Sequence, residues 1–176
     1  MLMAKQGNPS GVPDRPIIAS AGLEEMPIVA RLFRDYEAWL GVSLCFQDFD
    51  KEVASLPGFY AAPKGGLWLG WRGDAAVGVV GLRPLADPGT CEMKRLWVDP
   101  AEQGSGLGRR LACLCIDEAR ARGYTRLCLD TLPKLDKART LYRSLGFCAC
   151  ERYNDNNLPG VLFYELDLTQ GVTERA

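Results

Sequence analysis

The sequence of 176 residues contains no histidine. Without an imidazole the chain cannot form a Ser-His or Cys-His nucleophilic site, and zinc sites of mixed cysteine and histidine ligands are excluded. A large net charge is also missing, because 21 basic and 22 acidic residues leave −1 at pH 7. We therefore expect no nucleic-acid or membrane role that depends on charge. The chemistry must use Glu, Asp, Tyr, Lys, Cys or backbone groups.

Signals for metal sites and membrane segments are also missing. The seven cysteines include no Cys-x-x-Cys spacing, so we expect no metal and interpret them as small buried hydrophobes in a reducing cytoplasm. The longest apolar run, around residues 75–82, is too short to span a membrane and is interrupted by glycine. Residues 1–15 are polar and rich in Gly and Pro, typical of a disordered tail. Residues 16–176 then suit a single domain with its own core.

The most informative segment is a glycine-rich loop between a strand and a helix. An apolar run ends at the turn signal Asp99-Pro100, and glycines follow at positions 104, 106 and 108. A helical pattern of apolar residues begins at Leu107. At such a helix N-terminus the backbone N–H groups lack partners, and missing Cβ atoms allow a close approach. The loop therefore predicts a phosphate-binding site.

Two common phosphate loops do not fit this spacing. A Walker loop needs a lysine after the glycines, and none follows. A dinucleotide fingerprint needs a glycine where Arg109 stands, and its glycines should begin directly at the end of the strand. Asp130, near the spacing of a ribose-binding acid, keeps a dinucleotide-binding module open as an alternative. The pattern that fits is Gln-x-x-Gly-x-Gly, formed by Gln103, Gly106 and Gly108.

This pattern resembles the acyl-CoA signature of the GNAT superfamily of N-acetyltransferases. Further along, residues 138–147 read Ala-x-x-Leu-Tyr-x-x-x-Gly-Phe, which is similar to a helix of the same superfamily. A helix-ending glycine, Gly123, and a strand lie between the two motifs. The resemblance covers roughly residues 66–168. One departure is Leu135, where many members carry an asparagine that contacts the cofactor.

The resemblance implies an α+β protein with the GNAT fold, in which helices flank a central mixed, mostly antiparallel sheet with a splayed parallel pair. Hydrophobic periodicity and turn residues predict elements in a matching order. The expected strands are 16–21, 66–71, 75–82, 91–98, 125–131, 148–153 and 161–168. The expected helices are 24–40, 46–56, 107–122 and 137–145.

The resemblance also implies acetyl-CoA as the co-substrate. Pantetheine would bond the backbone of the strand before the loop, where a free N–H would polarise the thioester carbonyl. The loop N–H groups would hold the pyrophosphate, with an arginine nearby. The cofactor-binding residues implied are Leu96, Trp97, Val98, Gln103, Gly104, Ser105, Gly106, Leu107, Gly108 and Arg109.

Acetyl transfer to an amine requires a proton acceptor and a proton donor. An alkyl amine with a pKa of about 10.4 is mostly protonated at pH 7 and calls for a base. Glu92 falls where some histone-acetylating members carry a glutamate base, although alone it could be a solvent-facing strand residue. Tyr142 stands where the superfamily's tyrosine protonates the coenzyme A sulfur, although alone it could be a core aromatic. Because neither Cys91 nor Cys128 has a basic partner, we expect direct transfer in a ternary complex rather than an acyl-cysteine intermediate.

The sequence leaves the amine acceptor open. In the superfamily the acceptor lies between the loop after the first helix, the splayed strands and the loop joining the last two strands. Here these segments supply Gln47, Asp48, Asp50, Tyr60, Asp130, Tyr153, Asn154, Asp155 and Asn157. The carboxylates favour a cationic amine, but a small amine, an amino acid, an antibiotic and a protein N-terminus or lysine all remain possible acceptors. The sequence is compatible with a monomer or a homodimer. A non-catalytic acyl-CoA sensor is the alternative from another class; it would keep the loop but could lose Tyr142.

Overall fold

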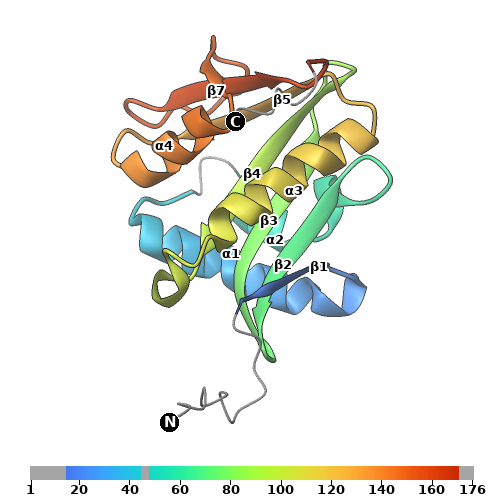
Figure 1. The fold of residues 1–176 in the computed structure, drawn as a ribbon, viewed down its shortest axis with the longest axis vertical. Coiled ribbons are helices and arrows are strands. Elements are labelled where there is room, and N and C mark those ends of the chain that lie inside the picture. The colour runs from blue at the N-terminus through green and yellow to red at the C-terminus, as the bar shows by residue number, and fades with distance from the viewer. Residues whose placement is uncertain (1–14, 45–47, 171–176) are drawn as a thin grey trace, which may run out of the picture.

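The computed structural model describes residues 15–44 and 48–170, and within them seven strands form one sheet in the order β1-β2-β3-β4-β5-β7-β6 (Figure 1). Every neighbouring pair is antiparallel except β4 and β5, which are parallel. This confirms the mixed, mostly antiparallel sheet. The tail expected over 1–15 lies outside the described residues, apart from Arg15. The strands are β1 (Ile17–Ser20), β2 (Gly66–Arg72), β3 (Ala75–Pro84), β4 (Thr90–Val98), β5 (Arg126–Thr131), β6 (Cys148–Ala149) and β7 (Leu162–Asp167).

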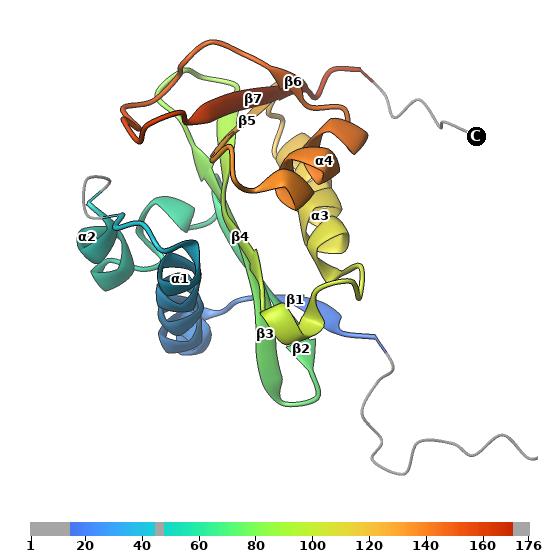
Figure 2. The ribbon, with the colours of Figure 1, turned by 90° about the vertical axis from the view of Figure 1, so that its left-hand side faces the viewer.

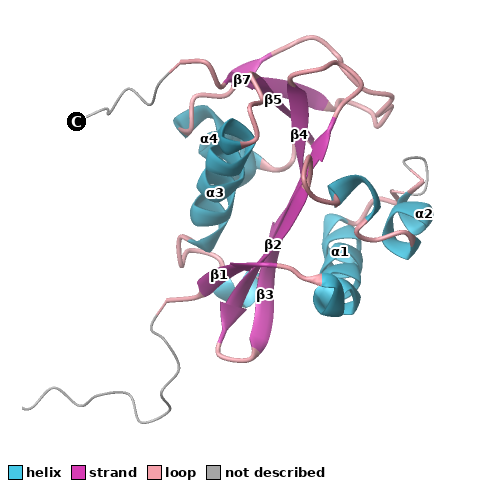
Figure 3. Cartoon of the chain, turned by 90° about the vertical axis from the view of Figure 1, so that its right-hand side faces the viewer, coloured by secondary structure: helices cyan, strands magenta, loops and turns pink. Residues whose placement is uncertain are grey.

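Helices cover both faces of the sheet. On one face lie α1 (Met26–Leu40) and α2 (Phe49–Ala54), and on the other lie α3 (Leu107–Ala121) and α4 (Asp136–Ser144), as the two side views show (Figure 2, Figure 3). Short 3-10 turns are η1 (Leu23–Glu25), η3 (Gly58–Tyr60) and η4 (Pro100–Glu102). In the described ranges, no helix is long and apolar enough to cross a membrane.

Each face of the sheet buries its own hydrophobic cluster. The α1 cluster includes Val29, Leu32, Phe33 and Leu40, and the α3 cluster includes Leu107, Leu111, Cys115 and Ala119. These positions recur at helical spacing, so each helix turns one apolar stripe to the sheet. Residues 46 and 47 of the helix expected over 46–56 lie outside the described residues, and the helix there begins at Phe49.

A β-bulge in β4 changes which face its side chains occupy. Val79 pairs with Trp97 and Gly81 with Lys94, so Arg95 and Leu96 together oppose one residue of β3. Arg95 has φ +57°, a left-handed conformation that is rare for a residue with a side chain. In a regular strand Met93 and Trp97 would share a face, yet Met93 packs in the α3 cluster and Trp97 in the α1 cluster. The bulge therefore reverses which face of the sheet the side chains in the second half of β4 occupy.

The parallel pair separates along its length. β4 and β5 are paired only through Thr90↔Arg126, Cys91↔Leu127 and Glu92↔Cys128. Beyond Glu92, β4 continues to Val98 and β5 to Thr131 without further pairing between them. The fold class therefore includes the splayed pair that was expected.

The strand expected over 148–153 is shorter in the structure, because β6 ends at Ala149. The Cys150 N–H still bonds the Phe163 carbonyl at 3.0 Å, but the chain then leaves the sheet. The side chains of Tyr153 and Asn154 bond carboxylates on β4 and β5 instead. Leaving buried carboxylates without donors costs more than losing exposed strand hydrogen bonds, which accounts for the early end of β6.

Candidate active site

A groove of about 790 Å³ follows the splayed edge of β4. At one end the glycine loop and the start of α3 line it, and at the other the ends of β5 and α1. Ala138, Leu141 and Tyr142 of the second motif line it from α4. Of the ten expected cofactor-binding residues, only Ser105 does not line it. Both sequence motifs therefore meet at one cavity.

The glycine loop carries backbone donors without partners. The N–H groups of Gln103, Ser105 and Leu107 bond inside the loop. Those of Gly104, Gly106, Gly108 and Arg109 meet no acceptor in the part of the chain that the structure describes. Gly104 and Gly106 have φ of +90° and +79°, and at neither would an added Cβ find an atom within 4 Å. Open space in front of four free donors at a helix N-terminus is an anion-binding arrangement.

The edge of β4 is also open to a ligand. Residues 93–98 line the groove beyond the last residue pair with β5. Backbone groups that face β5 on this stretch have no strand partner there, so an extended amide-containing ligand could bond to them as an added strand does. Leu96, Trp97 and Val98 all belong to this edge.

Tyr142 lies in the groove and in the core at once. Its side chain is 7% exposed, and its ring packs edge-to-face on Phe147 with 5.8 Å between centroids. Among the described residues its hydroxyl has no hydrogen-bond partner. Burial raises the pKa of Tyr142, and the nearby Tyr36 and Asp130 raise it further. The phenol is therefore protonated at neutral pH and can donate into the groove.

Glu92 is held inside a polar network rather than exposed. Its side chain is 0% exposed, so the solvent-facing alternative is wrong. Oε2 accepts from Arg83 at 2.6 Å, and Oε1 accepts from Tyr153 at 2.8 Å, Asn154 at 3.2 Å and Lys94 at 3.3 Å. Glu92 does not line the groove. Direct proton transfer from a bound amine would first require one of these donors to leave.

Asp130 is the carboxylate of this network that lines the groove. Its Oδ2 accepts from Lys94 at 3.1 Å, Asn154 at 2.8 Å and Asn156 at 3.2 Å, whereas Oδ1 receives only a long contact of 3.4 Å from Lys94. Burial alone would raise the pKa of Asp130, but Lys94 and the two asparagines bring it below its usual range. Asp130 is thus ionised, with one oxygen available to a ligand.

A second buried ion pair supports the bulge. Arg95 bonds Glu52 of α2 through Nη2 at 2.6 Å and Nε at 3.1 Å, and the Tyr60 hydroxyl donates to the same carboxylate at 2.6 Å. The Arg95 guanidinium also lies 5.0 Å from the centre of the Phe49 ring. These contacts join α2 to β4, and they offset the unusual φ of Arg95.

The acceptor-side residues expected from the sequence divide into two groups. Asp130, Tyr153 and Asn154 meet in the network, and Tyr60 is buried against Glu52. The others are exposed: Asp48 pairs with Lys51 and Asp50 with Arg34. Asp155 and Asn157 are also exposed, and Gln47 lies outside the described residues. Of these residues, as far as the structure describes them, Asp130 alone lines the groove.

Four cations that line the groove were not expected from the sequence: Lys94, Arg95, Lys134 and Lys137. The signal for the first two is the Lys-Arg pair inside the apolar strand between Met93 and Leu96. Charged residues inside a buried strand are rare unless they are paired.

The Acetyltransferase (GNAT) family model matches residues 29–147. The chain belongs to the GNAT acetyltransferase family. It is 37% identical over 141 residues to the uncharacterized N-acetyltransferase C1271.07c of Schizosaccharomyces pombe, covering 79% of this chain and 86% of that protein. It is 30% identical over 139 residues to YjgM of Escherichia coli, likewise an uncharacterized N-acetyltransferase, covering 77% of this chain and 83% of that protein.

Solved GNAT structures share the fold. An acetyltransferase of the GNAT family from Staphylococcus aureus has a TM-score of 0.74 at 18% identity and covers 87% of this chain and 99% of its own. The acetyltransferase yncA of Salmonella typhimurium, solved with its cofactor acetyl-CoA, has a TM-score of 0.71 at 20% identity and covers 93% of this chain and 99% of its own.

The two cysteines weighed as acyl acceptors, Cys91 and Cys128, are buried. Cys91, Cys115 and Cys128 are buried and none of the six described cysteines is in a disulfide; Cys45 lies outside the described residues. Burial raises the pKa of Cys128 to about 12 and also raises that of Cys91. A thiol with a raised pKa is a poor acyl acceptor at neutral pH.

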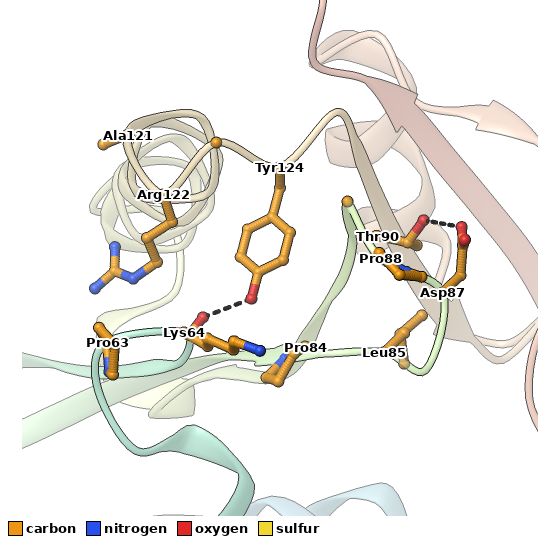
Figure 4. A pocket seen from close by; sticks show the side chains of 12 residues that line it. Pro63, Lys64, Pro84, Leu85, Asp87, Pro88, Thr90, Ala121, Arg122 and Tyr124 are labelled. Carbon is orange, nitrogen blue, oxygen red and sulfur yellow. Dashed lines mark hydrogen bonds between the residues drawn. The ribbon is translucent and has the colours of Figure 1, made fainter.

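A second hollow, of about 530 Å³, lies at the far end of α3 (Figure 4). The Tyr124 hydroxyl donates to the Lys64 carbonyl at 2.9 Å across it, and Arg122 on its wall is paired with Glu118. None of the residues of the two GNAT motifs lines it. The chemistry of the site therefore concentrates in the first groove.

Proposed function

We propose that this GNAT protein transfers an acetyl group from acetyl-CoA directly to a primary amine in a ternary complex. The observation that carries the proposal is the continuity of one groove. It is bordered by four free N–H groups of the loop, the unpaired edge of β4, Tyr142 and Asp130.

The backbone would hold the acetyl donor. The loop donors of Gly104, Gly106, Gly108 and Arg109 face the pyrophosphate, where the helix dipole of α3 adds to the attraction. Residues 96–98 bond pantetheine at the open strand edge, and an N–H there polarises the thioester carbonyl. Leu135 replaces the family's asparagine, so the side-chain contact at that position is absent.

Two residues would carry out the proton transfers, one as acceptor and one as donor. A neutral amine must attack, and after the N–C bond forms the nitrogen becomes acidic enough to lose a proton to a carboxylate. Asp130 is placed for this through Oδ1, whose one bond, from Lys94, is long, while Glu92 positions Lys94 beside it. Tyr142 donates to the departing sulfur, whose basicity is also raised in a dry groove. The raised pKa of Tyr142 keeps that proton in place until it is needed.

The test is thiol release from acetyl-CoA with a panel of amines, together with thermal unfolding in the presence of acetyl-CoA or NAD. We expect acetyl-CoA, but not NAD, to stabilise the fold, and we expect thiol release that depends on an amine. A ligand at a hundred times its dissociation constant stabilises the fold by about 2.7 kcal/mol. Stabilisation without thiol release for any amine would indicate an acyl-CoA sensor, and stabilisation by NAD alone would mean that the phosphate loop has been misassigned.

A further inference from the structure

The acceptor end of the groove is lined by more cations than anions. Its charged side chains, from β4, β5 and the start of α4, are Lys94, Arg95, Lys134, Lys137, Asp130 and Asp136. The carboxylates of Glu92 and Glu52, which pair with the first two, do not line the groove. A ligand at this end therefore meets four positive groups and two negative groups.

The ammonium of Lys134 has N–H donors that no other described residue uses. Its ammonium donates to the carbonyl of Leu40 at 2.5 Å, at the C-terminal end of α1. No carboxylate of the described chain forms an ion pair with it. An ammonium carries three N–H bonds, so two remain for a ligand. The partial negative charge at a helix C-terminus holds the side chain in this position.

An aromatic surface adjoins this lysine. Tyr36 and Trp39, one turn apart on α1, lie stacked with 6.5 Å between ring centroids and 29° between their planes. Both line the groove, and Trp39 directly precedes Leu40, to which Lys134 is bonded. Trp39 is 45% exposed, an unusual amount for so large an apolar ring. The ring can contact a flat or apolar group on the ligand.

We propose that the amine acceptor is a free α-amino acid with an apolar or aromatic side chain, whose carboxylate binds Lys134 and whose amine faces Oδ1 of Asp130. The proposal rests on the proposed acetyl transfer and names the substrate class of the same groove. The opposite charges of Asp130 and Lys134 match the two charges of a zwitterion, and Lys134 retains unused donors for its carboxylate. The reaction balances: the bound ammonium first loses one proton to solvent, and the neutral nitrogen then forms the N–C bond as the C–S bond of the thioester breaks. The second nitrogen proton offsets the one that the departing sulfur takes up, so coenzyme A leaves as the thiol and one proton is released overall.

The experiment compares three acceptors that share a phenyl ring and an amine: L-phenylalanine, L-phenylalaninamide and 2-phenylethylamine. Turnover is followed by thiol release in the wild-type protein and in three variants, with the other L-amino acids and their amides as a wider panel. Lys134→Gln keeps a donor for the Leu40 carbonyl and removes the charge, whereas Lys134→Arg keeps both. Lys64→Gln removes the same charge in the second hollow and serves as the matched control.

We expect the wild type to prefer the amino acid over its amide, although the amide's amine is less basic and so more often neutral. Lys134→Gln should raise KM for the amino acid by roughly 10- to 100-fold and leave the amide unchanged. Lys134→Arg should retain the preference, and Lys64→Gln should behave as wild type.

Turnover of amides or simple amines but of no free amino acid overturns the substrate class while leaving acetyl transfer intact; a preference for the amide would indicate a peptide N-terminus. An unchanged acid-over-amide preference in Lys134→Gln overturns the role of Lys134. Absence of thiol release with every amine overturns the proposed function and this inference together.

Discussion

Gly106→Ala can separate phosphate binding from backbone strain, because α3 is flanked by a matched pair of glycines. Gly106 precedes the helix and Gly123 follows it, both with φ of +79° and both with no atom within 4 Å of an added Cβ. A left-handed backbone costs an alanine about 1–2 kcal/mol. Both variants should therefore lose the same stability, and only Gly106→Ala places a methyl group before the free N–H groups.

The expected loss of affinity follows from those donors. A methyl group at Gly106 would hold a pyrophosphate oxygen away from the loop, weakening at least one charge-assisted hydrogen bond. Such a bond is worth about 1.5–3 kcal/mol, and each 1.4 kcal/mol is tenfold in affinity. We expect Gly106→Ala to weaken acetyl-CoA binding by about 10- to 150-fold, and Gly123→Ala to leave it unchanged.

Isothermal calorimetry with acetyl-CoA, paired with urea unfolding of the same two variants, provides the measurement. Equal stability losses with affinity lost only in Gly106→Ala support the phosphate site. Native affinity in Gly106→Ala would refute it, and equal affinity losses in both variants would trace the effect to strain in α3 instead.

Four further substitutions test the rest of the site and the fold. Tyr142→Phe should lower kcat by about 10²–10⁴-fold with unchanged calorimetric acetyl-CoA affinity; full turnover would make Tyr142 a core aromatic. Glu92→Gln should lower kcat/KM by the same factor at pH 7 and pH 9, because Glu92 positions Lys94; a loss confined to neutral pH would identify Glu92 as the base. The pKa of Asp130 is depressed in the fold, so its ionised form stabilises the protein above about pH 4 and this contribution is lost as the pH falls through the lowered pKa; urea unfolding across pH should therefore show a flatter acid loss in Asp130→Asn. Gly81→Ala would bring a Cβ to 2.5 Å from the Tyr60 ring and should cost about 1–3 kcal/mol in urea unfolding; wild-type stability would mean that the ring moves freely.

Local features of the fold and site could be predicted from the sequence. The glycine loop, the start of α3 and Tyr142 each belong to a short motif whose residues are neighbours in the chain. The strand order follows the same alternation of elements, and the splayed pair was expected from the resemblance. Side-chain periodicity and turn residues predict the helices and strands, whereas the splayed pair follows from the family resemblance alone.

The polar network could not be predicted, because it depends on contacts between distant segments. Glu92 reads as an ordinary alternating strand residue until Arg83 from β3 and Tyr153 from the last loop reach its oxygens. The bulge at Arg95 changes the face of everything after it, and its partner Glu52 lies on a different helix. Period-two reasoning assumes a regular strand, so it cannot place side chains beyond a bulge.

The most direct test of acetyl transfer is the stoichiometry between thiol release and acetylated amine, measured by mass spectrometry on the same reaction. Wild-type protein with acetyl-CoA and an accepted amine should form one N-acetylated amine for each coenzyme A thiol released. Thiol release without an acetylated amine would mean hydrolysis, and an acetyl group retained on the protein would mean a covalent intermediate; either result would contradict direct transfer.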